Sequence, residues 1–389
     1  MREALISNIT LEKLSLRSHE IRVIDFEILW RTKWRGELYS KRQVFEKVSK
    51  IHKEASINVI RPGFLRFSHL DYWSIVFSHG REIARQLREF KPDIVVGFGI
   101  LNTYLSMRLA KRRHIPFVYY LIDSLHTLVP FKPYHPIARA IERKTLQGAD
   151  NVLAINEELR NYAIGIGAEP SKTIVIRAGV DFKRFNPRIN GDEIRRLYGF
   201  RREDVVLLFI GWLYPFSGLR EVVLELAKKQ EEYSNLRVLV VGEGDLFPEL
   251  KAMKERYALK QLVLAGRRPY DEIPSFISAS DICLLPAHRN ITMRNIVPIK
   301  MYEYMACGKP VISTKLPGIV REFGFDSGIV YVDRPEDVLS KVTELLGNAR
   351  SIRERRIKAL QFVEEYSWDK ISDDFEGTLE TTIRMKVKL

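Results

Sequence analysis

The feature of this sequence that most constrains its fold is the alternation of short strand-like and longer helix-like segments along its whole length. In the first half we expect strands at 20–25, 57–60, 93–98, 116–122, 151–155 and 173–176, separated by helical stretches such as 80–90, 104–113 and 137–147. A second series follows the polar stretch 186–204, with strands at 205–210, 237–241, 262–265, 282–285, 310–313 and 329–332. This alternation predicts an α/β protein with two doubly wound parallel sheets.

The length of the chain indicates two domains. A chain of 389 residues is too long for an ordinary single core, and two domains of roughly 200 residues each are close to the usual size. The series of strands is interrupted at 184–203, so we expect an N-terminal domain over 1–184 and a C-terminal domain over 185–369. Because ligands of doubly wound sheets gather beyond the carboxyl ends of the strands, the expected site is a cleft between the two domains.

Cysteine content and hydropathy exclude several classes of protein. Cys283 and Cys307 are the only cysteines, and their apolar surroundings indicate neither a disulfide framework nor a structural zinc site. No apolar run reaches the roughly 18 residues that span a bilayer, and the first residues, MREALISNITLEK, lack the apolar core of a signal peptide. The sequence therefore predicts a cytoplasmic protein that is soluble or peripheral at a membrane.

Positive charge is concentrated in the first half of the chain. Residues 1–184 hold 31 Lys and Arg against 19 Asp and Glu, whereas residues 185–389 hold 32 against 30. Ten basic and three acidic side chains fall within 31–66, interleaved with aromatic residues. This composition suits an anionic membrane surface or a phosphate-bearing acceptor. A solvated helix face around 41–53 is the other interpretation. Nucleic acid is not an expected partner, because no recognised nucleic-acid-binding motif occurs.

Four expected strands of the second half end at a turn that a ligand can approach. The segments read FIGWLYPFSG at 209–218, VVGEGD at 240–245, LAGRR at 264–268 and SDICLLP at 280–286. Each is a weak signal alone, because any strand–glycine–helix connection of an α/β protein looks like this. Their order and spacing are therefore more informative than any one of them.

A fifth block, VPIKMYEYMACGKPVIST at 297–314, combines a polar helix start, a lone Glu303 and a glycine–proline turn before a β-rich run. With the four turns before it, this block closely resembles the donor domain of the family 4 glycosyltransferases, which have the GT-B fold. The resemblance implies that the helix N-terminus faces a diphosphate, which its unpaired amides and dipole favour. Glu303 would accept the ribose hydroxyls. Its alternative is an exposed glutamate on a helix.

The resemblance extends over nearly the whole chain. IVIRAGVDFKRFNP at 174–187 is similar to the family's interdomain segment. EYSWD at 365–369 looks like the start of the tail that returns to the first domain, so we expect 370–389 to pack there. IDSLH at 122–126 resembles the strand end where many family members place an active-site histidine. His126 is therefore a candidate catalytic residue, and its alternative is a histidine packed at a strand end.

Three departures from the family pattern stand out. GW at 211–212 and SG at 217–218 replace a Gly-Arg and a Lys-Gly pair, so both cations that serve the diphosphate are missing. Asn295 replaces the first glutamate of the family's E-x7-E motif, eight residues before Glu303. The family's first strand and its glycine-rich loop are expected to be missing, because Met1 falls at the helix that follows them.

The resemblance gives a set of candidate site residues. His126 and Asn295 are expected to act in catalysis, and the expected donor-binding residues are Trp212, Ser217, Gly218, Gly242, Gly266, Arg267, Lys300 and Glu303. We expect Lys300, on the first turn of the Glu303 helix, to supply the lost phosphate charge, with Arg267 or Arg294 beside it. No Asp-x-Asp element ends a strand, so neither a metal nor another cofactor is expected besides the nucleotide-sugar co-substrate. Amides and cations would then stabilise the leaving group.

These features predict a metal-independent, hexosyltransferase-type enzyme of polysaccharide or glycolipid biosynthesis. It would move a sugar from a nucleotide diphosphate sugar to a glycan or lipid-linked acceptor, with retention of configuration by resemblance. The alternative is a weak or inactive homologue that serves as a nucleotide- or membrane-binding partner subunit, which the lost cations favour. A sugar-phosphate synthase or nucleotide-sugar epimerase of the same architecture would need a phosphate or catalytic-acid constellation that the sequence does not display.

Overall fold

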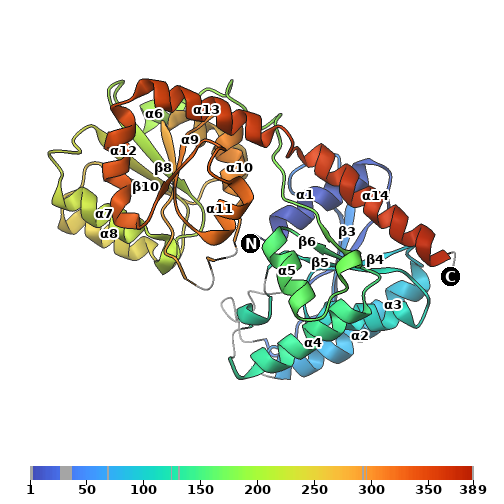
Figure 1. The fold of residues 1–389 in the computed structure, drawn as a ribbon. Coiled ribbons are helices and arrows are strands. Elements are labelled where there is room, and N and C mark those ends of the chain that lie inside the picture. Colours follow the sequence, from blue (N-terminus) through green and yellow to red (C-terminus); the bar gives the residue numbers. More distant parts are fainter. Residues whose placement is uncertain are drawn as a thin grey trace. The chain divides into compact units, whose positions relative to one another are not determined.

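The computed structural model describes residues 3–26, 37–67, 70–123, 125–129, 132–290, 293–294 and 296–387. The chain divides into two compact units (Figure 1). Unit 1 consists of Met1–Ala178 and Trp368–Leu389, and unit 2 of Gly179–Ser367. The first boundary therefore lies after residue 178, within the segment 174–187 that resembles an interdomain connection, and six residues before the boundary expected at 184.

Unit 1 carries two sheets among its described residues. The strands are β1 (Arg22–Ile24), β2 (Gln43–Val48), β3 (Ile57–Arg61), β4 (Val95–Gly97), β5 (Phe117–Leu121), β6 (Asn151–Ala154) and β7 (Thr173–Val175). The helices are α1 (Glu3–Leu16), α2 (Leu70–Glu89), α3 (Leu101–Lys111), α4 (His135–Gly148), α5 (Glu157–Gly165) and α14 (Trp368–Val387). The short turns η2 (Leu125–Leu128), η3 (Lys132–Tyr134) and η4 (Pro170–Lys172) are 3₁₀-helical. One sheet has the order β1-β3-β2 and the other is the parallel sheet β4-β5-β6-β7.

Strand β2 corrects one expectation. The interpretation of 41–53 as a helix face is wrong, because β2 pairs antiparallel with β3, with Val44 opposite Ile60. Residues 43–47 of β2 are all exposed, so the strand has no buried face. A half-buried strand is recognised in a sequence by apolar residues that alternate with polar ones, and that signal is missing here. The remainder of the basic segment is partly neutralised, since Arg42 bonds Glu82 at 2.9 Å and Arg61 bonds Asp25 at 2.6 Å. Residues 31–36 of that segment lie outside the described residues.

The C-terminal helix α14 belongs to unit 1. Its Phe375 is fully buried and stacks on Tyr120 of β5, with ring centroids 5.7 Å apart. Thr382 accepts a hydrogen bond from Asn151 Nδ2 at 2.6 Å, and Lys386 Nζ lies 2.6 Å from Asp150. The first residues of α14 also pair with α1, through Lys13 and Asp369 at 2.5 Å. Burial of an aromatic ring and several polar contacts together hold this helix on the sheet of unit 1.

Unit 2 is built around one parallel sheet with the order β10-β9-β8-β11-β12-β13. The strands are β8 (Val205–Ile210), β9 (Leu236–Val241), β10 (Leu262–Gly266), β11 (Ile282–Leu285), β12 (Val311–Thr314) and β13 (Ile329–Val332). The helices are α6 (Asp192–Leu197), α7 (Leu219–Lys228), α8 (Phe247–Arg256), α9 (Ile273–Ala279), α10 (Ile299–Ala306), α11 (Pro317–Phe323), α12 (Val338–Leu346) and α13 (Ala349–Val363). The short turns are η5 (Pro215–Ser217), η6 (Tyr270–Glu272) and η7 (Pro335–Asp337).

The strand order of unit 2 positions its site. From β8 the chain builds outward to β9 and β10, and then returns to place β11 on the other side of β8. The strands are continuous apolar runs, such as VVLLFI in β8 and LRVLVV in β9, because helices cover both faces of a parallel sheet. The order of strands reverses between β8 and β11, and loops that leave adjacent strands in opposite directions open a crevice there. The carboxyl ends of β8 and β11 are therefore where a ligand of this sheet is expected.

Candidate functional site

Three glycines form a shelf of bare backbone at the carboxyl ends of β8, β9 and β10. The amide of Gly211 donates to Val241 O at 2.9 Å, and the amide of Gly242 donates to Gly266 O at 2.8 Å. Gly242 has φ +143°, and a Cβ atom there would lie 1.9 Å from Gly211 O. No side chain fits at that position, so the turns after β8 and β9 approach each other through their backbones. The structure thus brings the candidates Gly242 and Gly266 together.

The loop after β8 meets the loop after β11 at the crevice. Gly218, which begins α7, has φ +74°, and a Cβ atom there would lie 1.8 Å from Pro286 O. Beside it Ser217 is 5% exposed, and among the described residues its hydroxyl has no hydrogen-bond partner. A buried hydroxyl without a partner is costly in a finished structure. Ser217 is therefore suited to a ligand oxygen at the position where the family pattern places a diphosphate-binding cation.

Aromatic side chains occupy the loop between the two glycines. Tyr214 and Phe216 stack with ring centroids 4.7 Å apart, and Trp212 lies 6.3 Å from Tyr214. Trp212 is 45% exposed and Tyr214 is 37% exposed. The loop therefore presents flat apolar surface at the crevice, which suits the face of a sugar ring or a base and contributes no charge.

Helix α10 holds the end of β8 through two side chains. Lys300 Nζ donates to Ile210 O at 2.9 Å, and the Ile210 amide donates to the Tyr304 hydroxyl at 2.9 Å. Lys300 is 7% exposed, and its ammonium group lies 3.8 Å from the centroid of the Phe209 ring. The positive charge of Lys300 is thus fixed at the carboxyl end of β8, next to the glycine shelf. Tyr304 also orients this strand end.

Glu303 is buried on the same helix. It is 6% exposed, so the alternative of a solvent-exposed glutamate is wrong. Its Oε1 accepts a hydrogen bond from the Tyr270 hydroxyl at 2.8 Å, and burial with the nearby carboxylate raises the pKa of Tyr270 far above its usual value. Tyr270 packs on Phe185 at 5.7 Å and lies under Arg184 at 5.1 Å. Glu303 is thereby held against η6, which follows Gly266 at the end of β10 and Arg267.

The other cations near the crevice have different roles. Arg268 is turned into the protein, where it donates to Ala265 O at 3.1 Å and to the Tyr198 hydroxyl at 2.8 Å. Arg267, Arg289 and Arg294 are exposed. The candidate Asn295 lies outside the described residues.

His126 lies in unit 1, in the turn η2 that follows β5. Its Nδ1 lies 2.8 Å from the Tyr162 hydroxyl and 3.1 Å from Glu142 Oε2, and its ring stacks on Tyr162 with centroids 5.8 Å apart. Tyr162 donates to Glu142 Oε2 at 2.5 Å, which uses its only proton. In this arrangement Nδ1 must itself carry a proton and donate, so Nε2 is the acceptor nitrogen of the neutral ring.

Burial dominates the electrostatics around His126. Glu142 is fully buried, and desolvation raises the pKa of its carboxyl to about 7 against the opposing hydrogen bonds from Tyr162 and Tyr119. Desolvation, together with the charges of Arg139 and His135, lowers the pKa of His126. At neutral pH the histidine is therefore uncharged beside a carboxyl that titrates in the same range.

Tyr162, Tyr270, Tyr304 and Glu142 belong to these clusters but were not among the sequence candidates. Tyr270 follows the LAGRR turn directly and carried no signal beyond that position. Glu142 did carry one, because it occupies a core position of α4: the buried residues of that helix include Ala138, Glu142 and Leu146, which are spaced as one helical face. A carboxylate at such a position requires partners inside the protein.

The described residues contain no group of three or more His, Cys, Asp or Glu side chains placed to hold a metal ion. Asp281, directly before β11, is used structurally, since its Oδ2 accepts from the Val206 amide at 2.8 Å. Among the described helices, none combines the length and the apolarity needed to cross a bilayer.

Family models and curated sequences match both units. The model of Glycosyl transferases group 1 matches residues 190–361, and the model of Glycosyltransferase Family 4 matches residues 11–184. A D-inositol 3-phosphate glycosyltransferase of Thermomonospora curvata is 26% identical over 281 residues, which is 65% of this chain and 64% of that protein. A second such enzyme, from Streptomyces bingchenggensis, is 25% identical over 306 residues, 72% of this chain and 64% of that protein. The matches thus span somewhat less than two thirds of these relatives.

Solved structures share the fold over nearly the full length. Sucrose-phosphate synthase from Thermosynechococcus elongatus superposes with a TM-score of 0.74 at 14% identity, covering 97% of this chain and 92% of that one. HepE from Anabaena, in complex with UDP and glucose, gives a TM-score of 0.74 at 15% identity, covering 98% and 96%. At such identities the likeness shows the fold alone.

Proposed function

We propose that this chain, which belongs to the family 4 glycosyltransferases of GT-B fold, transfers a sugar from a nucleoside diphosphate sugar to a glycan or lipid-linked acceptor. Its second unit matches the model of Glycosyl transferases group 1. The observation that carries the proposal is the pairing of the glycine shelf after β8, β9 and β10 with the two side chains of α10. Lys300 is fixed at the end of β8, and Glu303 is buried against the loop after β10. A backbone that a ligand can approach closely, a cation and a carboxylate are features that suit a diphosphate and a ribose.

The chemistry assigned to these residues follows from charge. Breaking the anomeric bond places negative charge on the leaving diphosphate, so groups fixed in advance around it lower the barrier. Lys300 and the partnerless hydroxyl of Ser217 would serve the diphosphate, and Glu303 the ribose. The Trp212 face would pack on a ring of the donor or acceptor. Retention of configuration, the absence of a metal and the roles of Arg267 and Asn295 remain proposals that rest on the family pattern.

His126 would act in unit 1 on the acceptor side. Its Nε2 is an acceptor in the tautomer that Glu142 and Tyr162 impose, so it can receive a hydrogen bond from a sugar hydroxyl. The basic segment 31–66 would face a phosphate-bearing acceptor or a membrane. Because HepE is known with UDP and glucose bound, a UDP-sugar is the first donor to test.

The test is a thermal-shift and hydrolysis screen with UDP-, GDP- and ADP-sugars on three proteins. A donor that binds only the folded state must raise the unfolding temperature. Glu303→Gln should lose the shift, and Glu322→Gln is the matched control, because Glu322 also accepts a tyrosine hydroxyl, that of Tyr302, at 2.8 Å. A shift that survives in Glu303→Gln would contradict the proposed donor site. A shift without hydrolysis or transfer would instead support a nucleotide-binding partner subunit, which the absence of the two diphosphate cations favours.

A further inference from the structure

Helices α2, α3 and α4 form a layer on unit 1 in which α3 packs against both others. The first turns of α2 and the start of α4 also meet, through an edge contact between Tyr72 and Tyr134 at 5.8 Å. Each helix runs from the carboxyl end of one strand back toward the start of the next, so one side of this layer faces the sheet and the other faces outward (Figure 1). We call this outward side the α2–α4 face.

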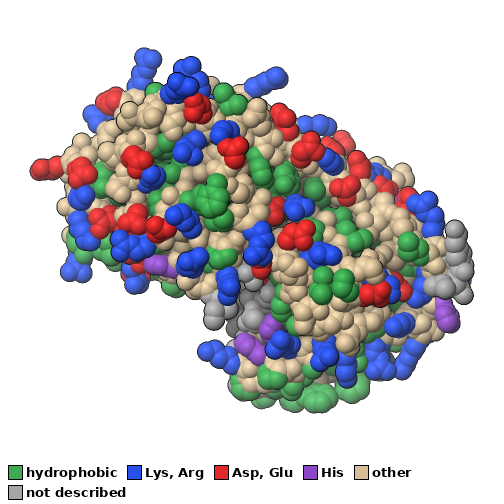
Figure 2. All heavy atoms as spheres, viewed as in Figure 1, with side chains coloured by type: hydrophobic (Ala, Val, Ile, Leu, Met, Phe, Trp, Pro, Cys, Tyr) green, Lys and Arg blue, Asp and Glu red, His purple; other side chains and the backbone are tan. Residues whose placement is uncertain are grey.

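Large apolar side chains are exposed at one end of the α2–α4 face. Trp73 is 68% exposed and Phe77 is 69% exposed, and with Leu70 at 51% they follow one side of α2 at helical spacing. Ile137, in the first turn of α4, is 59% exposed. Figure 2 shows hydrophobic side chains gathered along this edge of unit 1, beside Lys and Arg. Single exposed apolar residues are ordinary, but a cluster that includes a tryptophan and a phenylalanine marks an interaction site.

The rest of the α2–α4 face is cationic. The three helices carry seven exposed basic residues against one exposed carboxylate, Glu89, and these basic residues are Arg81, Arg88, Arg108, Lys111, Arg139, Arg143 and Lys144. The other carboxylates of α2 and α4 are buried, as Asp71, Glu82 and Glu142 show. Helix α3 contains no acidic residue at all. Glu89 lies 3.7 Å from Arg88, so the other six cations have no exposed carboxylate of these helices to neutralise them.

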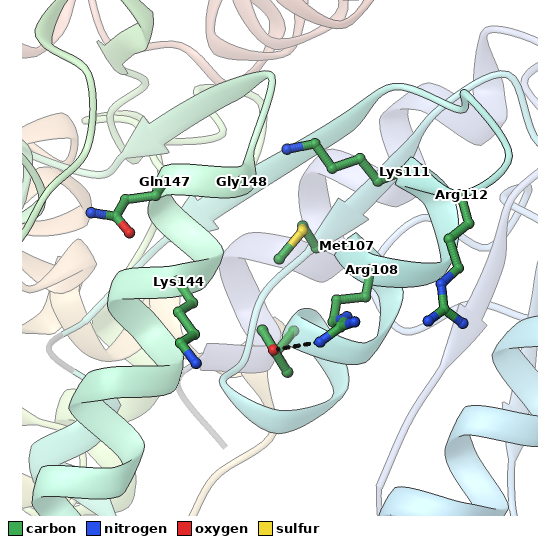
Figure 3. Close-up of a pocket in the computed structure, with 8 residues that line it drawn as sticks. Met107, Arg108, Lys111, Arg112, Lys144, Gln147 and Gly148 are labelled. Atoms are coloured by element: carbon green, nitrogen blue, oxygen red, sulfur yellow. Dashed lines mark hydrogen bonds between the residues drawn. The ribbon is translucent and has the colours of Figure 1, made fainter.

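Some of these cations converge on a groove between α3 and α4. The hollow measures about 530 Å³ and is lined by Tyr104, Met107, Arg108, Lys111, Arg112, Lys144, Gln147 and Gly148. Figure 3 shows Arg108 from α3 and Lys144 from α4 directed into the space between the helices, with Met107 between them. Arg108 is steadied by a hydrogen bond to the Tyr104 hydroxyl at 3.1 Å. The groove thus offers positive charge from two sides over an apolar floor.

We propose that the α2–α4 face is a docking surface for an anionic phospholipid bilayer. In this arrangement Trp73 and Phe77 enter the interfacial region, and the cations of α3 and α4 meet lipid phosphates. The combination selects this partner: an amphipathic tryptophan belongs at a membrane interface, and clustered Lys and Arg are attracted to anionic headgroups. Nucleic acid would use the cations but not the apolar end, and a second copy of this positively charged face would repel the first. The inference rests on the proposed function in one respect: a lipid-linked acceptor would lie in the bilayer to which this face docks.

The experiment measures sedimentation of the full chain with vesicles and without any sugar donor. The vesicles are phosphatidylcholine alone, or roughly two parts phosphatidylcholine to one part phosphatidylglycerol. The parent should bind only the anionic vesicles, and high salt should weaken the binding. Trp73→Ala with Phe77→Ala should weaken it about tenfold, since two interfacial aromatics are lost. Arg108→Glu with Lys111→Glu and Lys144→Glu should weaken it on the order of a hundredfold.

Matched controls lie in unit 2. Phe325→Ala removes an aromatic that is 72% exposed, and the triple change Lys251→Glu, Lys260→Glu, Arg353→Glu reverses three exposed charges. Both should bind anionic vesicles as the parent does. Circular dichroism should show that all variants fold, because every changed side chain is solvent-exposed.

Several results would overturn the proposal. They are equal binding of neutral and anionic vesicles, a parent that does not bind anionic vesicles, and site variants that bind as tightly as their controls. Binding of RNA without vesicles, or a dimer that Trp73→Ala dissociates without vesicle binding, would assign the face to another partner. The donor thermal shift, measured in parallel, separates the two proposals. Vesicle binding without a donor shift would contradict the proposed function and support the docking surface. A donor shift without vesicle binding would support the proposed function and contradict the docking surface.

Discussion

Tyr162 donates its hydroxyl proton to Glu142 inside unit 1, with 2.5 Å between the oxygens, and the same hydroxyl lies 2.8 Å from His126 Nδ1. A fully buried carboxyl is thereby connected to a partly buried histidine, through one tyrosine and through a direct contact of 3.1 Å. Because a hydroxyl has a single proton, its direction fixes which atoms on either side donate and which accept. The charge of Glu142 therefore determines the proton arrangement of the whole group.

Stability should depend on pH through Glu142. Burial raises the pKa of this carboxyl to about 7 in the folded state, above the value near 4.5 of the unfolded chain, so the folded state binds more protons between these two values. The contribution of Glu142 is then fully present below about pH 4.5 and is lost as the pH rises through about 7. His126 has the opposite sign, because its lowered pKa costs stability as the pH falls below 6.5.

Comparison with Glu142→Gln isolates this carboxyl. The stability of the parent relative to Glu142→Gln should be greater at pH 5 than at pH 8 by on the order of 2 kcal/mol, measured by urea unfolding. Because both proteins retain His126, its contribution cancels to first order. A difference that does not change with pH would show that Glu142 is not protonated preferentially in the folded state.

The tautomer of His126 should follow the same titration. With Glu142 ionised, Tyr162 donates to the carboxylate and Nδ1 of His126 carries the proton. With Glu142 protonated, the carboxyl can donate to Tyr162, which can then donate to Nδ1 and leave the proton on Nε2. Nitrogen NMR of the histidine ring should therefore show the Nδ1–H form increasing from pH 6 to pH 8. Glu142→Gln should abolish the dependence, and an unchanged profile in that variant would contradict the coupling.

Lys300→Ala should weaken binding of the nucleoside diphosphate about tenfold, or ~1.4 kcal/mol, because a buried cation at the glycine shelf is lost. It should also destabilise unit 2 by about 1–3 kcal/mol, since Ile210 O loses its donor. Lys309→Ala is the control that separates weaker diphosphate binding from lower stability of unit 2. Lys309 Nζ likewise donates to backbone oxygens, Ser278 O at 2.8 Å and Ser280 O at 2.7 Å. Calorimetric titration at a temperature where both variants are folded should show weaker binding for Lys300→Ala alone.

Gly242→Ala should destabilise unit 2 by about 3 kcal/mol or more, because the new Cβ atom would lie 1.9 Å from Gly211 O in a backbone conformation that suits only glycine. Gly266→Ala is the matched comparison. Gly266 also has a positive φ of +67°, but no atom lies within 4 Å of its added Cβ, so its cost should be about 1–2 kcal/mol. Equal costs, measured by denaturant unfolding, would show that the close approach of the two turns does not matter.

Chelation should leave the donor site intact. The described residues contain no cluster placed to hold a metal, and Lys300 with the Ser217 hydroxyl is proposed to stabilise the diphosphate. The donor thermal shift and any transfer should therefore be unchanged in EDTA. A loss in EDTA that Mg²⁺ restores would contradict a metal-independent mechanism.

Much of the architecture was predictable from the sequence because its signals are local. Apolar runs that are buried on both faces predict parallel strands wherever they occur, and the strands of unit 2 were expected within a few residues of their observed bounds. The turns after β8, β9 and β10 were likewise marked by glycines. The exposed strand β2 was not predictable in this way, because it has no buried face and exists through its pairing with β3.

The sequence by itself determined the two-domain α/β class, the glycine turns and the candidate residues of the 297–314 block, because composition and spacing record these directly. Only the tertiary structure decided that Lys300 holds the end of β8, that Tyr270 bonds Glu303, and that Glu142 and Tyr162 orient His126. These pairs are 90, 33 and 16 residues apart in the chain. The physical reason is that hydrogen bonds and burial depend on distance in space, which the packing of strands and helices sets.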